Sequence, residues 1–430
     1  MSFQKRRGFT TGYCWLRRVA LYGVLLILLM ICRFSWPSDE AANAEAQSKK
    51  EWYARYASLG ETVSYEGEEI WPLLDLAVDS KGFRYMVFHY NRWDLFEYHY
   101  QRAVRKWRTG VYGSDFLEDA AGKKARAEVH RYPSIAIRLD QHDRPHILWS
   151  RSKLHYMTAK GKYPERDGWI HSVVPLEDYE DEIFPRFAVS SDGTPYVLYF
   201  GWEEGGRDVK FASMQEGKWK IESLGIKFEP ASTILYDITV GKDDEIIVAV
   251  CYRKEYPNGD HRLVLLTKSE DEWAREEIGT LDSLTNYPEN IKVLVDPEGN
   301  PHIFYFNEDV LEKNREDYAI YEQYFLKENK WQREAIVRSR PGMVVLPEAF
   351  SVDISPDGKI FVCYADMATG LYLVEKKGDK WQEHLLDEIK KIIKTSIAAV
   401  NSSEVAIAFL SKSRLLEGLS QIDYKRAKSE

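Results

Sequence analysis

A repeated two-strand pattern constrains the fold of this chain most strongly. Seven segments share an apolar strand, a turn rich in Asp, Gly, Ser or Pro, and a second strand that ends in aromatic or apolar residues. This pattern predicts a β-hairpin in each segment. The hairpin segments begin at Leu76, Ile137, Ala188, Ile238, Val293, Val352 and Ala398. Because the segments recur every 50 to 60 residues or so, we expect one all-β repeat fold rather than several unrelated domains.

A tryptophan opens a fourth strand in most of these repeats. A third strand follows the hairpin, as in LHYMTA from Leu154, and a polar turn then leads to the tryptophan. The tryptophans are Trp107, Trp169, Trp219, Trp273, Trp331 and Trp381. Four short strands with their turns fill about 50 residues, the size of one propeller blade. We therefore predict an all-β, seven-bladed β-propeller with these tryptophans packed between neighbouring blades.

The last repeat lacks its fourth strand. Only a third strand, from Ser420, follows the final hairpin, whereas Lys50–Gly60 near the start of the chain resembles Lys218–Gly225 in pattern. We predict that the strand after Trp52 closes the ring by pairing with the C-terminal blade. This pairing would cover the strand edges that an open ring leaves exposed.

Residues 1–44 have the composition of an export signal. Basic residues precede the uncharged apolar run Val19–Cys32, and Ala42-Asn43-Ala44 offers a cleavage site. As a helix the run would reach roughly 21 Å, short of the ~30 Å hydrocarbon core of a bilayer. We expect a cleaved signal peptide or a retained membrane anchor over residues 1–44. The propeller, over residues 45–430, is then expected to be periplasmic, secreted or anchored outside the cytoplasm.

Charge and cysteine content exclude several kinds of partner. The net charge is −9, and residues 1–44 are net basic, so the remainder is more acidic still. Nucleic acid is therefore not an expected partner. Cys251 and Cys363 lie in apolar strands of non-adjacent repeats, which predicts buried free thiols. The sequence has no metal-ligand spacing, so we expect no bound metal. We also expect no cofactor. The chain is expected to be a monomer.

Aromatic, His and Arg residues cluster where the first three repeats leave their strands. In a propeller, the loops that join consecutive repeats gather on one face around the central channel. Guanidinium groups bind carboxylates and sulfates bidentately, and aromatic rings stack on sugars. We predict a groove there that selects an acidic glycan. Its residues are His89, Arg92, Trp93, His130, Tyr132, Trp149, Arg151 and Arg186. By contrast, His146 and His302 follow Pro at the same place in two repeats, which favours a structural role.

The chain resembles the BNR/sialidase-like propeller group over roughly residues 50 to 430. The segment from Asp296 to Ile303 follows the D-x-x-G-x-P pattern of such repeats, with His302 and an aliphatic residue after it. The resemblance implies a carbohydrate-related role, since the group includes sialidases, sugar-binding proteins and polysaccharide lyases. The sialidase Asp box is absent, because Ser190–Pro195 lacks its spacing and its tryptophan. No catalytic residue is therefore carried over from the group.

Two classes of function stay open at this point. The first is a non-catalytic propeller that binds a glycan or an envelope protein. The alternative is a polysaccharide lyase or glycosidase acting on an acidic polysaccharide. A lyase needs Arg or His to neutralise the uronate carboxylate, and His or Tyr to move the protons. Candidates for those roles are His89, Tyr90, His130, Tyr132, Arg151 and Arg186.

Overall fold

The structure is a computed structural model. It describes residues 59–67, 74–90, 95–101, 114–116, 134–150, 153–161, 168–176, 184–203, 206–228, 234–253, 261–269, 272–281, 291–307, 318–389, 391–412 and 420–428. All of these belong to one compact unit, Ala57–Ser429. The predicted export signal, residues 1–44, lies outside the described part. Within the described residues, no helix is long and apolar enough to cross a membrane.

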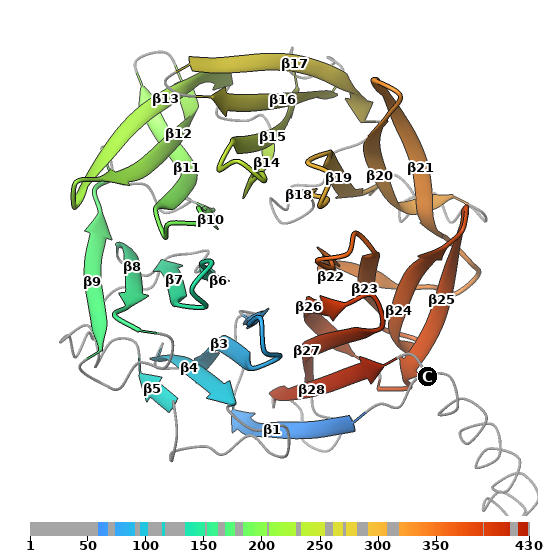
Figure 1. Cartoon of the computed structure of the whole chain (residues 1–430). Helices are drawn as coiled ribbons and strands as arrows, with labels where there is room; N and C mark the ends of the chain where they lie inside the picture. Colours follow the sequence, from blue (N-terminus) through green and yellow to red (C-terminus); the bar gives the residue numbers. More distant parts are fainter. Residues whose placement is uncertain are drawn as a thin grey trace, which may run out of the picture. The chain divides into compact units, whose positions relative to one another are not determined.

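The described strands form seven four-stranded antiparallel sheets arranged around a central axis (Figure 1). Sheet 1 consists of β2 (Leu74–Val78), β3 (Arg84–Tyr90), β4 (Leu95–Gln101) and β5 (Ser114–Phe116). Sheet 2 consists of β6 (Ser134–Leu139), β7 (Pro145–Ser150), β8 (Leu154–Ala159) and β9 (Trp169–Val174). Sheet 3 consists of β10 (Arg186–Val189), β11 (Pro195–Glu203), β12 (Gly206–Gln215) and β13 (Lys218–Phe228). Sheet 4 consists of β14 (Ile234–Val240), β15 (Ile246–Arg253), β16 (His261–Ser269) and β17 (Glu272–Leu281). Sheet 5 consists of β18 (Ile291–Val295), β19 (Pro301–Phe306), β20 (Ala319–Lys327) and β21 (Lys330–Arg338). Sheet 6 consists of β22 (Val345–Ile354), β23 (Ile360–Asp366), β24 (Gly370–Lys377) and β25 (Lys380–Asp387). Sheet 7 consists of β26 (Ile392–Asn401), β27 (Glu404–Lys412), β28 (Ser420–Lys428) and β1 (Leu59–Gly67). This arrangement confirms the predicted all-β propeller class, and each predicted hairpin is formed.

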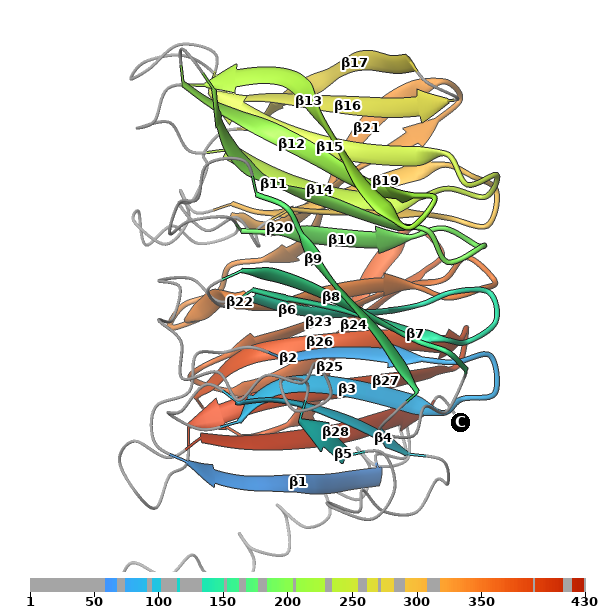
Figure 2. The ribbon, with the colours of Figure 1, turned by 90° about the vertical axis from the view of Figure 1, so that its left-hand side faces the viewer.

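Turn chemistry explains the Asp and Gly residues of the repeat. In sheet 2, Asp140 Oδ1 accepts hydrogen bonds from the backbone N–H groups of His142 and Arg144, both at 2.9 Å. In sheet 5, Asp296 Oδ1 accepts from Asn300 N at 2.8 Å, and Gly299 has φ +94°, which favours glycine. These turns gather on one side of the sheets (Figure 2). The repeated Asp and Gly are therefore hairpin residues, as predicted.

The two repeated histidines contact these turn aspartates. His146 Nε2 lies 3.3 Å from Asp140 Oδ2, and His302 Nε2 lies 3.3 Å from Asp296 Oδ2. Burial lowers the pKa of His146, although its hydrogen bond with Asp140 opposes that shift. The matching contacts in two sheets confirm a structural role for both histidines.

Tryptophans of the outer strands link neighbouring sheets. Trp219 of β13 donates Nε1–H to Ser172 Oγ of β9 at 3.2 Å. Trp273 of β17 donates to Glu222 Oε1 of β13 at 2.9 Å. The predicted packing between neighbouring sheets is confirmed at these positions, while Trp107 lies outside the described residues. Cys251 and Cys363 are buried free thiols, as expected.

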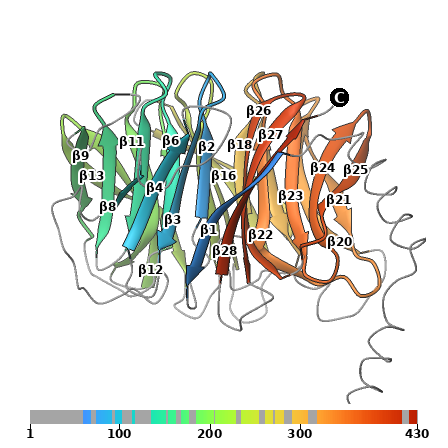
Figure 3. The same ribbon diagram turned by 90° about the horizontal axis from the view of Figure 1, so that it is seen from below.

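Two strand positions differ from the sequence prediction. The fourth strand of sheet 1 is the short β5, beyond Trp107. The strand that pairs with β28 is β1, which begins at Leu59 rather than near Trp52, with Val63 opposite Ile422 (Figure 3). The prediction matched Lys50–Gly60 with Lys218–Gly225, so Gly60 and Gly225 were the last residues compared. In β13, however, the chain continues through Gly225 to Phe228, so this glycine marks an irregularity within a strand.

We expect β1 to stabilise the whole ring, because without it β28 would present an unpaired edge. Two truncated chains, one beginning at Ala57 and one at Glu68, test this. The chain that retains β1 should melt cooperatively. The chain without β1 should aggregate or melt at least several degrees lower by circular dichroism. Identical melting curves would show that the ring does not need this strand.

The hydrogen bond between Trp273 and Glu222 should contribute measurably to stability. Replacing Trp273 by Phe removes this bond and should lower the free energy of unfolding by about 1 kcal/mol beyond the loss of ring area. Trp381 is the matched control, because its buried Nε1 has no hydrogen-bond partner among the described residues. Urea unfolding of both Phe variants gives the comparison. Equal losses would mean that the hydrogen bond contributes nothing.

Candidate functional site

The innermost strands enclose a cavity of about 420 Å³ at the centre of the ring. This volume lies in the range of small-molecule sites. Residues from β2, β6, β10, β14, β18, β22 and β26 line the cavity, and Figure 1 shows these strands nearest the axis. Its charged lining residues are Asp75, Arg138, Arg186, Asp237, Lys292, Asp353 and Lys394. The cavity thus concentrates opposite charges at the one place where all seven sheets meet.

Three aspartates of the lining connect the inner edges of neighbouring sheets. An innermost strand has no partner strand on its cavity side, so the backbone N–H groups there need other acceptors. Each aspartate accepts one such N–H from the first strand of the next sheet. These bonds run from Ile137 N to Asp75 Oδ2 (2.9 Å), from Val293 N to Asp237 Oδ2 (3.0 Å) and from Ala399 N to Asp353 Oδ2 (2.7 Å). The carboxylates therefore stabilise the ring as well as charging the cavity.

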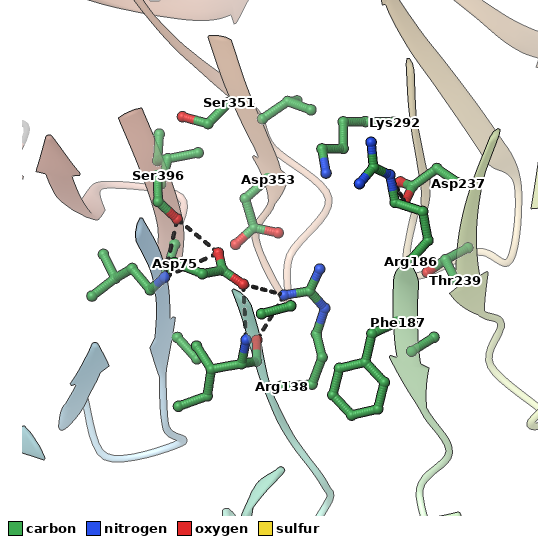
Figure 4. A pocket seen from close by; sticks show the side chains of 18 of the residues that line it. Asp75, Arg138, Arg186, Phe187, Asp237, Thr239, Lys292, Ser351, Asp353 and Ser396 are labelled. Carbon is green, nitrogen blue, oxygen red and sulfur yellow. Dashed lines mark hydrogen bonds and ion pairs between the residues drawn. The ribbon is translucent and has the colours of Figure 1, made fainter. Parts of the chain in front are cut away.

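One side of the cavity carries a close ion pair. Arg138 Nη1 lies 2.8 Å from Asp75 Oδ2, and Ser396 Oγ donates to Asp75 Oδ1 at 3.0 Å (Figure 4). Burial lowers the pKa of Arg138, but Asp75 and the other cavity carboxylates raise it further, so the net shift is upward. Asp75 and Arg138 therefore largely satisfy each other.

Arg186 lies on the other side of the cavity, where Figure 4 places it near Asp237 and Lys292. Its side chain is only 9% exposed. Arg186 Nε lies 3.8 Å from Asp237 Oδ1, beyond hydrogen-bond distance, and Nη1 donates to Pro185 O at 3.3 Å. The buried Nε and Nη2 atoms have no hydrogen-bond partner among the described residues. A buried guanidinium with unused donors is costly, and an anionic ligand would satisfy it.

Asp353 has a different environment from the other cavity carboxylates. Its oxygens accept hydrogen bonds from the backbone N–H groups of Ile354 (2.9 Å) and Ala399 (2.7 Å), and no ion pair to it occurs among the described residues. Burial raises its pKa to about 6. The two backbone N–H groups and Arg138 oppose the shift, while Asp75 adds to it. The Asp353 carboxyl can therefore take up or release a proton near pH 6.

Of the predicted groove residues whose side chains the structure describes, one lies in this cavity, namely Arg186. His89 lies in β3, opposite Phe96 of β4, and nothing of its side chain is described. The remaining predicted positions lie outside the described residues, apart from Trp149. They are Arg92, Trp93, His130, Tyr132 and Arg151.

Trp149 is a core residue and not part of an open groove. It is 1% exposed and belongs to a hydrophobic cluster with Tyr85 and Val87. Its ring stacks on His155, with centroids 5.0 Å apart and planes 12° apart. The prediction took it for an exposed aromatic at a strand end. In β7, however, every residue is buried between sheets.

Sequence reasoning missed most of the cavity lining. The signal was present as single charged residues within otherwise apolar first strands, such as Asp75 in LDLAV and Asp237 in ILYDITV. These strands were treated as core, although their inner edges face the cavity. Among the described residues, no group of three or more His, Cys, Asp or Glu side chains is placed to hold a metal ion.

No family model matches the chain, and no curated protein matches it. Among solved structures, the chain is similar to the β-propeller domain of the Trilobed protease from Pyrococcus furiosus, with 10% identity, TM-score 0.47, and coverage of 84% of this chain and 94% of that one. It is also similar to the α-L-arabinofuranosidase Arb93A from Fusarium graminearum, with 10% identity, TM-score 0.44, and coverage of 86% and 98%. A third is the polysaccharide lyase Uly1, with 10% identity, TM-score 0.47, and coverage of 83% and 89%. The likeness is one of fold, and the resemblance to the BNR/sialidase-like group stays a prediction.

The raised pKa of Asp353 predicts a pH-dependent contribution to stability. A carboxyl whose pKa rises on folding, here from 3.8 to about 6, stabilises the fold at low pH. This contribution is lost as the pH rises through about 6. Because the side chain is partly exposed to the cavity, we expect wild type to lose only about 1 kcal/mol relative to Asp353→Asn between pH 5 and 7.5. Urea unfolding across this range measures the difference. A constant difference would contradict the raised pKa.

Proposed function

We propose that the protein is a seven-bladed β-propeller, closed by β1, that binds an acidic glycan through an acidic sugar in its central cavity. The observation that carries this proposal is Arg186, a guanidinium with two unused buried donors that faces a cavity of small-molecule size. Lys292 adds a second positive charge to the same lining. Guanidinium groups recognise carboxylates and sulfates through paired hydrogen bonds.

The rest of the lining suits a sugar better than an apolar ligand. Residues with hydroxyl side chains, from several inner strands, line the cavity alongside the charges. They are Ser134, Thr239, Ser351, Thr395 and Ser396. The described lining contains no His or Tyr for the proton transfers of β-elimination. The cavity therefore supports binding, and a lyase or glycosidase stays the alternative.

The location of the protein is part of the same proposal. The basic start of the chain and the apolar run Val19–Cys32 support export, with the propeller outside the cytoplasm. An envelope glycan is then within reach as a ligand. An envelope protein with an acidic side chain is the other class of partner.

Isothermal titration calorimetry with D-glucuronate and D-glucose tests the proposal. We expect glucuronate to bind and glucose to bind much more weakly. Arg186→Gln should weaken glucuronate binding by roughly 10- to 150-fold, because charge-assisted hydrogen bonds contribute about 1.5 to 3 kcal/mol. The control is Arg275→Gln on the exposed face of β17, which should bind like wild type.

Three results would contradict this account. Full affinity in Arg186→Gln would place the site elsewhere, and equal binding of glucose would remove the role of charge. If neither sugar binds at millimolar concentration, the cavity is not an acidic-sugar site, and an envelope protein becomes the better candidate. Arg186→Lys, which retains the charge near Asp237 but loses the planar fork, should show an intermediate affinity.

A further inference from the structure

The cavity that holds Arg186 also holds a carboxylate that an incoming anion would encounter. Asp75 is paired with Arg138 at 2.8 Å, and Asp237 lies 3.8 Å from Arg186 itself. Asp353 has no ion pair among the described residues, and the hydrogen bonds to its oxygens come from the backbone N–H groups of Ile354 and Ala399. A bound anion and an ionised Asp353 would therefore repel each other across the cavity.

The positions of the strands fix the arrangement of these charges. β22, β26, β2 and β6 follow one another around the axis, and β10, β14 and β18 complete the circle (Figure 1). Figure 4 shows Asp353 between Asp75 and Arg138 on one side and Lys292, Arg186 and Asp237 on the other. Besides Asp353 of β22, the charged groups lining the cavity are Asp75 of β2, Arg138 of β6, Arg186 of β10, Asp237 of β14, Lys292 of β18 and Lys394 of β26.

We propose that anion binding at Arg186 is coupled to uptake of one proton by Asp353, so that the cavity binds its anion more tightly in mildly acidic medium. This inference rests on the proposed function and specifies how the same site is regulated. The proton comes from solvent and converts the Asp353 carboxylate to the neutral acid, and no covalent bond to the ligand forms. The neutral acid still accepts the Ala399 N–H hydrogen bond through its carbonyl oxygen.

The environment of Asp353 makes this coupling effective near neutral pH. Burial places its pKa at about 6 before any ligand is present. By linkage, an anion that binds better to the protonated form must raise this pKa further. Protonation removes one negative charge from a cavity whose lining also carries Arg138, Arg186, Lys292 and Lys394. The sign is therefore fixed: affinity rises as pH falls.

Titration with sulfate tests the inference, because sulfate stays a dianion from pH 5.5 to 7.5. Wild type should bind sulfate roughly three- to tenfold more tightly at pH 5.5 than at pH 7.5. Asp353→Asn should bind with the same affinity at both pH values, close to that of wild type at pH 5.5. Asp379→Asn, in an exposed turn, is the matched control and should retain the wild-type pH dependence. Glucuronate titrated in parallel shows whether an acidic sugar follows the same rule as a free inorganic anion.

A second measurement covers the case in which Asp353→Asn does not fold. The heat of sulfate binding to wild type at pH 6.5, measured in buffers of different ionisation enthalpy, gives the number of protons taken up. We expect a value clearly above zero and below one. Zero uptake, or equal affinity of wild type at both pH values, would overturn the coupling while leaving the acidic-sugar proposal intact. If glucuronate and sulfate both fail to bind, the proposed function itself is wrong, and this inference falls with it.

Discussion

The unpaired inner edges of the seven innermost strands are the constraint on which the rest of this structure depends. A sheet edge that faces a cavity leaves backbone N–H groups without strand partners. Three aspartates accept hydrogen bonds from such N–H groups, each from the first strand of the next sheet. They are Asp75, Asp237 and Asp353. The same contacts join consecutive sheets, so they hold neighbouring sheets in register at the axis.

Meeting this need with carboxylates has an electrostatic consequence. Buried negative charge must be balanced, and arginines of the inner strands lie beside two of these aspartates, Asp75 and Asp237. The two pairs differ in geometry: Arg138 contacts Asp75 at 2.8 Å, whereas Arg186 lies 3.8 Å from Asp237 and retains unused donors. In the pair of Arg138 and Asp75 the two side chains largely satisfy each other, so its role is structural. The second leaves a cation that can accept an external anion, which turns a feature of ring assembly into a candidate binding site.

The sequence predicted the propeller well because the residues of its repeat act through local contacts. Asp140 and Asp296 in their turns, and Trp219 and Trp273 on outer strands, each act within a few residues or against the adjacent sheet. The strand that pairs with β28 was predicted to within about ten residues; β1 begins at Leu59. Its exact bounds depend on pairing with a segment at the other end of the chain, which no local pattern encodes.

The candidate site was much harder to predict. An apolar strand that carries one charged residue looks like an ordinary core strand whose charged side chain faces solvent. Only when the strands converge on one axis do Asp75, Arg186 and Asp353 share a cavity. Trp149 illustrates the opposite error, since an aromatic beside Arg151 looked like a ligand platform and is a core residue packed between sheets. Convergence around an axis is a property of the assembled sheets, and a single sequence does not display it.

The central claim is that Arg186 holds an anion inside the ring, and a crystal of the protein soaked in selenate tests it most directly. Selenate has the shape and charge of sulfate, and its selenium gives an anomalous signal that locates it without ambiguity. The account predicts an anomalous peak in the central cavity, with selenate oxygens within hydrogen-bond distance of Arg186 Nε and Nη2. Peaks found only on the outer surface, with the cavity empty at saturating selenate, would contradict it.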